Sequence, residues 1–393
     1  EDMLAGAYMT GTGYSTVKTI LNMAGQETES RSTFFRHQAV CEEKLVNCAE
    51  QLTQKARDHF SGNVSMDCRW SSPVRGIHGV VSAVDTETLE VLEFAILTKK
   101  GKNRPTGNYE GASNNMETVG TSIIINQMKK HRIFEKIQKL VKDRDNKSKK
   151  LIEEAGAGDK IANDPGHFKK NFEKAYDKLV EESKNFTYVE NDEEVVVKSP
   201  FYGLKTHLLK WLNTCLKVLD QDVRVAKFIS CVPHYLGDHS NCSHTDDKKV
   251  FFWLTGILHE PIADRFIKFI DEQADIIMNV STEYTTQPVE SLNATYGRVA
   301  PKKSNCNRIR GKIASGIIRQ NSPKDFALLI RECCGSSPLP PSVARSLTKE
   351  AQNLFKKRLL SHQAEVMRAK NISRLKWRGQ YKDDPNGDYG QNK

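Results

Sequence analysis

A change of hydrophobic period between residues 63 and 98 constrains the fold more than any other feature of the chain. Apolar and polar residues alternate from Val64 to Asp67, β-branched residues dominate 77–84, and strict alternation returns over 92–96. A period of two places one side of each segment against a core, as in a β-strand. A short turn cluster joins the last two segments. We therefore predict three consecutive strands in an antiparallel meander.

A helix, a fourth strand and another helix follow the meander. Residues 114–132 have the spacing of an amphipathic helix, residues 136–141 alternate again and lead to Asp143, and a further helix opens over 147–154. Three antiparallel strands, a helix and a strand that joins in parallel form the beginning of a ribonuclease H-like domain. We predict an α/β fold with a ribonuclease H-like mixed sheet, interrupted by a large helical insertion.

Helical regions surround this sheet in the sequence. The cap residues and spacing before residue 62 resemble a helix-turn-helix, and a helical subdomain that only packs is an equal alternative. We expect single helices over 259–279 and 313–334. The predicted regions are a helical N-terminal region (1–62), the first part of the ribonuclease H-like domain (63–158), a helical insertion (159–282), the last part of that domain (283–335), and a linker with a basic C-terminal tail (336–393).

The charge balance points to a polyanionic partner. The chain has 59 Lys and Arg against 49 Asp and Glu, which gives a formal net charge of +10. Such a surplus favours nucleic acid as the first partner to consider. No run of about 18 apolar residues occurs, so we expect no transmembrane helix and no membrane partner. Nine scattered Cys residues are typical of a reducing compartment rather than of a disulfide scaffold.

Acidic residues stand on the first and fourth predicted strands. Asp67 lies on the first strand, and Asp143 and Asp145 follow the fourth. In a ribonuclease H-like sheet these positions lie side by side, and carboxylates that approach each other repel unless a cation joins them. Mg²⁺ or Mn²⁺ meets that need, because such ions take oxygen ligands and keep waters for phosphate oxygens. Two ions about 3.5–4 Å apart activate water or a 3′-hydroxyl on a phosphodiester.

A third carboxylate is needed to hold both ions. Glu290 fits, because it stands in the first turn of a predicted helix that begins near Pro288. Asp143 is preferred to Asp145 as the second acid because it directly follows the apolar strand, and Asp145, two residues later, is the alternative. Asp145 is equally suited to cap the helix at Lys147.

Seven segments resemble those of Mutator-like DDE transposases and occur in the same order. The sixth carries Cys and His, the last carries the third acid, and the fifth departs from the family pattern at Gly166, where Asn is expected. The matching segments are 66–72, 85–94, 109–117, 141–148, 164–170, 234–244 and 290–303.

The resemblance implies a DNA transposase whose catalytic residues are Asp67, Asp143 and Glu290. Such an enzyme would cleave and join DNA with two Mg²⁺ or Mn²⁺ ions, in the nucleus, on transposon ends and target DNA. A homodimer is expected because two ends are processed. Two alternatives stay open: a catalytically inactive, transposase-derived DNA-binding protein, and a nuclease that cuts but does not join.

A Cys/His segment lies in the predicted insertion. Cys231 and His234 form one pair, and Cys242 and His244 form a second. Four such ligands suit tetrahedral zinc. The alternative is a buried Cys and His pair that organises the insertion through hydrogen bonds.

The basic tail is the second candidate for contact with DNA. Between residues 345 and 382, eleven Lys and Arg stand against two Glu. Basic side chains would follow the phosphate backbone, and an indole would stack on a base. A solvated helix or a nuclear localisation signal would show the same composition. The candidate DNA-binding residues are Lys356, Lys357, Arg358, Arg374, Lys376, Trp377 and Arg378.

Overall fold

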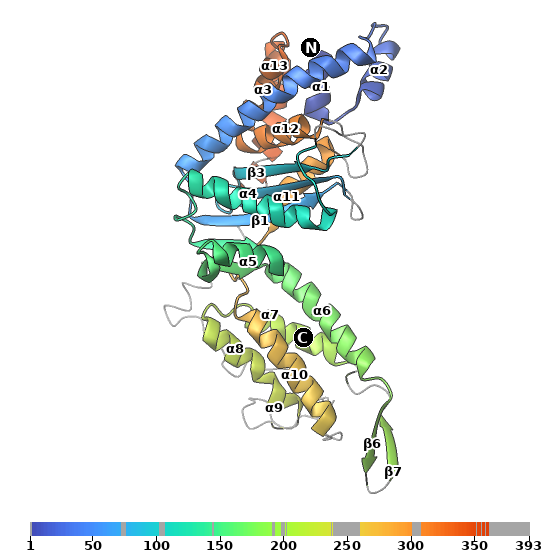
Figure 1. The fold of residues 1–393 in the computed structure, drawn as a ribbon, viewed down its shortest axis with the longest axis vertical. Coiled ribbons are helices and arrows are strands. Elements are labelled where there is room, and N and C mark those ends of the chain that lie inside the picture. Colours follow the sequence, from blue (N-terminus) through green and yellow to red (C-terminus); the bar gives the residue numbers. More distant parts are fainter. Residues whose placement is uncertain are drawn as a thin grey trace. The chain divides into compact units, whose positions relative to one another are not determined.

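The structure is a computed structural model of the 393-residue chain, and it divides into two compact units (Figure 1). Unit 1 comprises residues 1–161 and 285–365, and unit 2 comprises residues 162–284 and 366–393. The structure describes residues 2–71, 76–101, 107–143, 145–190, 193–197, 201, 203–236, 238, 260–300, 308–350, 352–354, 356–357 and 359–360.

A five-stranded mixed sheet forms the centre of unit 1. Its order is β3-β2-β1-β4-β5, with β1 antiparallel to β2, β2 antiparallel to β3, and β1 parallel to β4. The predicted meander and the parallel fourth strand are therefore confirmed, whereas the short β5 was not predicted. The strands are β1 (Asn63–Trp70), β2 (His78–Asp85), β3 (Val91–Thr98), β4 (Lys139–Lys142) and β5 (Ile161–Asn163).

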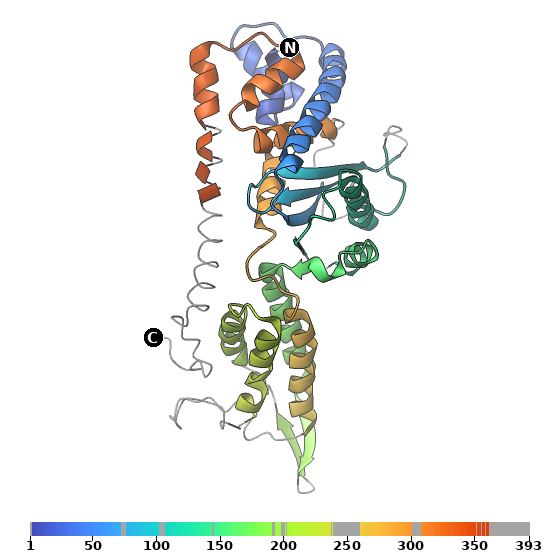
Figure 2. The same cartoon turned by 90° about the vertical axis from the view of Figure 1, so that its left-hand side faces the viewer.

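Helices cover both faces of the sheet (Figures 1 and 2). Alternate residues of β2 show this, because Val80 and Val84 belong to one hydrophobic cluster while Val81 and Ala83 belong to another. The first cluster draws on α1 (Asp2–Thr10), α3 (Arg31–Asp58), α11 (Gln287–Val299), α12 (Ile309–Asn321) and α13 (Phe326–Cys334). The second draws on α4 (Met116–Lys130) and α5 (Asn146–Glu154).

Local capping explains where several of these helices begin and end. Ser30 is the N-cap of α3, and its Oγ accepts a hydrogen bond from the Thr33 amide at 3.2 Å. Gly25, with φ of 71°, follows α2 (Tyr14–Met23), in the left-handed conformation that glycine adopts at little cost. The predicted helical character of residues 1–62 is confirmed by α1, α2 and α3.

The single helix predicted over 313–334 is wrong, because two helices, α12 and α13, occupy this segment. Pro323 stands two residues after the last residue of α12, and Ser322 lies between them. A proline disfavours helical backbone at the residue before it. Ser322 accordingly has φ of −136° and ψ of 64°, outside the helical region. The proline therefore ends α12, and the chain turns before α13.

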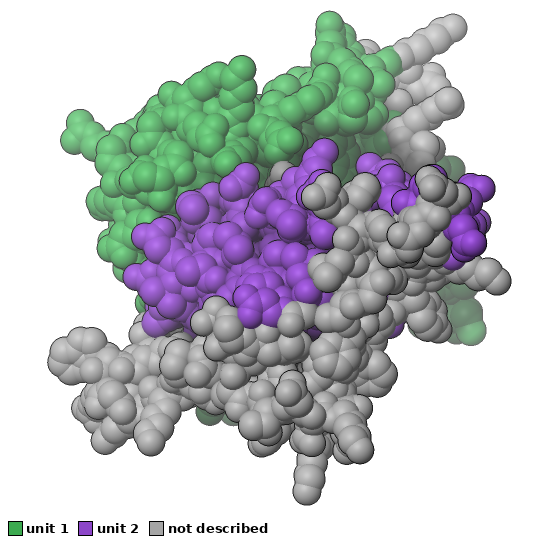
Figure 3. All heavy atoms as spheres, turned by 90° about the horizontal axis from the view of Figure 1, so that it is seen from below, with its two compact units in different colours: residues 1–161, 285–365 green, residues 162–284, 366–393 purple. Residues whose placement is uncertain are grey.

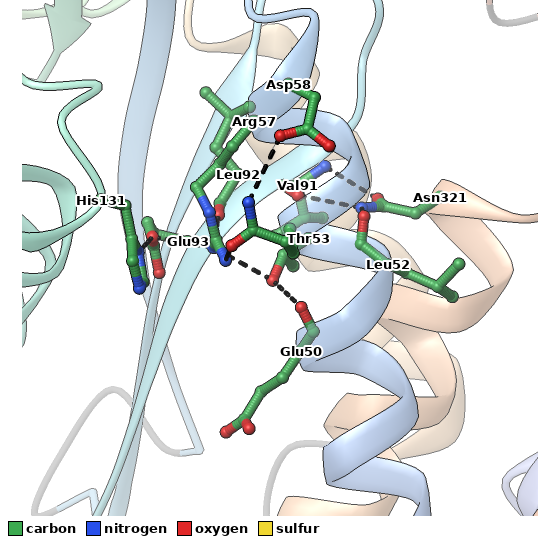
Figure 4. Close-up of polar contacts among 11 residues, drawn as sticks. Glu50, Leu52, Thr53, Arg57, Asp58, Val91, Leu92, Glu93, His131 and Asn321 are labelled. Carbon is green, nitrogen blue, oxygen red and sulfur yellow. Dashed lines mark hydrogen bonds and ion pairs between the residues drawn. The ribbon is translucent and has the colours of Figure 1, made fainter.

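A buried ionic network ties α3 to the sheet (Figure 4). Arg57 contacts Glu93 of β3 at 2.9 Å and donates to the Leu92 carbonyl at 3.0 Å. His131, just after α4, lies 2.5 Å from the same Glu93 oxygen. Because Arg57 and Glu93 are both almost fully buried, each charge depends on the other for compensation.

Asn321 satisfies the outer edge of β3 at the end of α12 (Figure 4). Its Oδ1 accepts from the Val91 amide at 2.8 Å, and its Nδ2 donates to the Val91 carbonyl at 2.9 Å. The side chain thus takes the place of a neighbouring strand for one residue of this edge.

Unit 2 is a helical unit with an aromatic core (purple in Figure 3). Phe172 packs against Phe228 and Phe269 with ring centroids 6.2 and 5.2 Å apart. The predicted long helix over 259–279 is present as α10. The elements are α6 (Pro165–Glu182), β6 (Phe186–Glu190), β7 (Glu193–Val197), α7 (Leu204–Cys215), α8 (Gln221–Ile229), α9 (Cys231–Tyr235) and α10 (Glu260–Ile277).

Arg224 of α8 joins the ends of two other helices inside unit 2. Its fully buried guanidinium donates to the Val218 carbonyl at 2.9 Å and the Leu219 carbonyl at 3.1 Å, just after α7. It also donates to the Ile277 and Val280 carbonyls at 3.1 and 2.6 Å, where α10 ends. Backbone carbonyls at and just beyond a helix end lack the donors that the helix interior provides, and Arg224 supplies donors to four of them.

Candidate active site

Helix α11 lies on the face of the sheet to which Asp67 points. Asn293 Nδ2 donates to Asp67 Oδ2 at 2.8 Å, and Tyr296 lies 3.2 Å from Ser82 of β2 through their hydroxyls. Arg69, two residues after Asp67, donates to the Ala300 carbonyl at 2.5 Å. Cys68, between these two strand residues, belongs to the hydrophobic cluster on the opposite face. Three polar contacts therefore fix α11 across β1 and β2.

Asp143 lies next to Asp67 because of the parallel register of β1 and β4. Met66 pairs with Lys142, so the next residue of each strand is an aspartate. Burial of the Asp67 carboxylate, followed by the charge of Asp143, raises the pKa of Asp67 to about 6. The structure thus brings two of the predicted acids together in a place where their charges are poorly solvated.

A partly buried ion pair lies close to these two acids. Lys142 of β4 contacts Glu117 in the first turn of α4, and the lysine side chain is only 2% exposed. The Lys142 charge lowers the pKa of Asp67, and the Glu117 charge raises it. Lys142 and Asn293 are residues of this site that sequence reasoning missed. Lys142 stands directly before Asp143 in the sequence, and Asn293 stands one helical turn after Glu290. These positions place both residues near the site but do not specify their partners.

Asp145 caps α5, which is one of the two roles considered for it. Its carboxylate accepts hydrogen bonds from the amides of Lys147 and Ser148 at 3.2 and 3.1 Å. Partial burial acts to raise the pKa of Asp145, but hydrogen bonds from Ser148 and Lys147 outweigh it and lower the pKa below its usual value. A cap of this kind keeps the carboxylate charged and stabilises the start of the helix.

Glu290 stands in the first turn of α11, as predicted, and its side chain is exposed. It lies one helical turn before Asn293 on the same side of the helix. Within the described part of the chain, no group of three or more His, Cys, Asp and Glu side chains is arranged closely enough to hold a metal ion. The structure therefore pairs Asp67 with Asp143 without gathering Glu290 into such a group.

Comparison with protein families identifies the chain. A family model described as Mutator-like transposase matches residues 1–248. The chain belongs to the Mutator-like transposase family. This membership supports a transposase-related function, suggests a nucleic-acid-processing enzyme, and implies DNA as a partner. The matched residues include Asp67 and Asp143 and end before Glu290. A search of curated proteins finds no match.

The other candidate residues of this Mutator-like transposase lie only partly within the described residues. Cys231 and His234 belong to the short helix α9, and both are buried. Burial raises the pKa of the Cys231 thiol well above its usual value. The remaining candidates, Cys242, His244, Arg358, Arg374, Lys376, Trp377 and Arg378, lie outside the described residues, whereas Lys356 and Lys357 are helical.

No helix in the described ranges is both long enough and apolar enough to cross a bilayer.

Proposed function

We propose that this member of the family cleaves DNA and transfers the cut strand with two metal ions on a ribonuclease H-like sheet. The observation that carries the proposal is the pairing of Asp67 and Asp143 on adjacent parallel strands, beneath a helix that bears Glu290. The strand order β3-β2-β1-β4-β5, with β4 parallel to β1, supports the ribonuclease H-like assignment.

The contacts of α11 support Glu290 as the third acid. Tyr296 contacts Ser82 of β2, and Asn293, three residues earlier, contacts Asp67 of β1. Three residues advance a helix by about 4.5 Å, and neighbouring strands are about 4.8 Å apart. Glu290 lies three residues before Asn293 in α11. The strand next to β1 on that side of the sheet is β4, which leads to Asp143. Glu290 is therefore the residue of α11 best placed to approach Asp143.

The carboxylates suit a divalent cation. The raised pKa of Asp67 reflects two negative charges that burial leaves poorly compensated, and a cation between them would remove that cost. Asp67 would bridge both ions, Asp143 would hold one, and Glu290 the other. Bound Mg²⁺ or Mn²⁺ would activate water for the first cut and a 3′-hydroxyl for joining, and would stabilise the leaving oxygen.

The assembly around this chemistry is also proposed. A net charge of +10 and the basic tail suit binding to the DNA backbone in the nucleus, and processing of two transposon ends suits a homodimer. Cys231, His234, Cys242 and His244 would hold a structural zinc ion. Native mass spectrometry should then show one zinc per chain that Cys242→Ser loses; protein expressed with zinc that carries none would refute the zinc site.

A strand-transfer assay on pre-cut DNA ends tests the proposed function. With Mn²⁺, the wild-type protein should join such ends to target DNA, while Asp143→Asn and Glu290→Gln should bind DNA without joining it. Cleavage without joining would favour the nuclease alternative. DNA binding with neither reaction would favour an inactive, transposase-derived DNA-binding protein. Full activity of Glu290→Gln would place the third acid elsewhere, with Glu283 or Glu260 next in line.

A further inference from the structure

The side chain of Asn293 has one satisfied end and one unsatisfied end. Its Nδ2 group donates to Asp67 Oδ2 at 2.8 Å. Its Oδ1 atom is buried and accepts no hydrogen bond from any residue that the structure describes. Buried acceptors are normally paired, so an unpaired one beside a carboxylate pair calls for a ligand or an ordered water.

The orientation of the amide follows from chemistry. An ionised carboxylate accepts hydrogen bonds and donates none, so the NH₂ end of Asn293 must face Asp67. The amide oxygen is then the free end, and it belongs to the same hard oxygen class as the carboxylates. One side chain thus orients Asp67 and presents a further acceptor beside the same carboxylate.

We propose that Asn293 is a positioning residue of the metal site: its Nδ2 group orients the Asp67 carboxylate, and its Oδ1 atom accepts a hydrogen bond from a metal-bound water. This inference rests on the function proposed above. Mutation of a group that holds a metal ligand in place typically weakens metal affinity by about 10- to 100-fold.

Tyr296 provides a matched control on the same helix. Asn293 and Tyr296 each make one hydrogen bond from α11 to the sheet, but Tyr296 contacts Ser82 instead of an acid. Substitution Tyr296→Phe removes its hydroxyl and keeps the ring in the hydrophobic cluster. A loss of affinity caused only by looser docking of α11 would therefore occur in both variants.

The test is calorimetric titration of Mn²⁺ into the full chain, with folding checked by circular dichroism. Asn293→Leu, and Asn293→Ala as the smaller alternative, should weaken Mn²⁺ binding by about 10- to 100-fold. Tyr296→Phe should bind Mn²⁺ as the wild type does, and Asp67→Asn should lose binding.

Three results would overturn the proposal, and they have different meanings. Wild-type affinity in both Asn293 variants, with binding lost in Asp67→Asn, would refute the role of Asn293 and leave the metal site standing. Equal weakening in Tyr296→Phe would assign the effect to helix docking. No binding to the wild type, or equal binding to Asp67→Asn, would refute the metal site and the role of Asn293 together.

Discussion

Asp67 carries its charge at a cost to the folded protein. Burial and the neighbouring Asp143 raise its pKa to about 6, whereas an unperturbed aspartate titrates near 3.9. A carboxyl group with a raised pKa favours folding when it is protonated. Its contribution is fully present below about pH 4 and is lost as the pH rises through about 6.

Asp67→Asn should therefore stabilise the metal-free protein at alkaline pH. The substituted amide can still accept from Asn293, and it removes the charge that faces Asp143. In EDTA at pH 8, urea unfolding should show a gain on the order of 1–3 kcal/mol, and the gain should vanish near pH 3.5. A variant that is less stable than the wild type at pH 8 would contradict the conclusion that the charge of Asp67 destabilises the metal-free protein.

Asp145→Ala should affect stability and leave the chemistry intact. The substitution removes the hydrogen bonds to the Lys147 and Ser148 amides, and loss of such a cap costs about 0.5–2 kcal/mol. Thermal unfolding would measure the cost, and a Mn²⁺-dependent cleavage assay would measure activity. Loss of cleavage in Asp145→Ala with activity retained in Asp143→Asn would shift the second acid by two residues.

At the scale of elements, the Arg57–Glu93 pair joins α3 to β3. Substitution Arg57→Met would leave Glu93 buried without its main partner, at a cost of about 3–5 kcal/mol at pH 7. The double variant Arg57→Met, Glu93→Gln should recover part of that loss, because no buried charge is left. Denaturant unfolding of both variants checks this, and equal losses in the two would show that packing, not charge, matters here.

Hydrophobic period predicted the central elements because each has one clear pattern. Apolar and polar residues alternate along β1 and over residues 92–96 of β3, and β2 is a β-branched run that is buried at every position. The helix over 114–132 is present as α4, preceded by a short 3₁₀ turn. The short β5 has only three residues, too few for a period to show. The break between α12 and α13 was missed although Pro323 marks it, since the apolar spacing continues on both sides.

The acids of the site were easier to predict than the groups that hold them. Asp67 lies within β1 and Asp143 directly follows β4, and the parallel pairing of these two strands brings the acids together. Asn293 contacts Asp67 across 226 residues of sequence, and no local pattern encodes such a contact. The partner of Lys142 is likewise set by how α4 packs on the sheet, which the period of either segment does not specify.

At the scale of the whole molecule, we expect the basic tail to contribute to DNA affinity and to contribute little to the stability of the fold. Deleting residues 345–393 removes twelve Lys and Arg against five Asp and Glu. Affinity for DNA should fall, and the plot of log affinity against log salt should become shallower, since fewer counterions are released. Fluorescence anisotropy at several salt concentrations measures both, and an unchanged slope would show that the tail does not contact DNA.

The central claim is that the Asp67 site uses a divalent metal to cut DNA. The most direct measurement is Mn²⁺-dependent cleavage of long DNA by the wild-type protein and by Asp67→Asn, with DNA binding measured in parallel. The wild type should cleave with Mn²⁺ and not in EDTA, while Asp67→Asn should bind DNA equally well without cleaving it. Equal cleavage by both proteins would contradict the account.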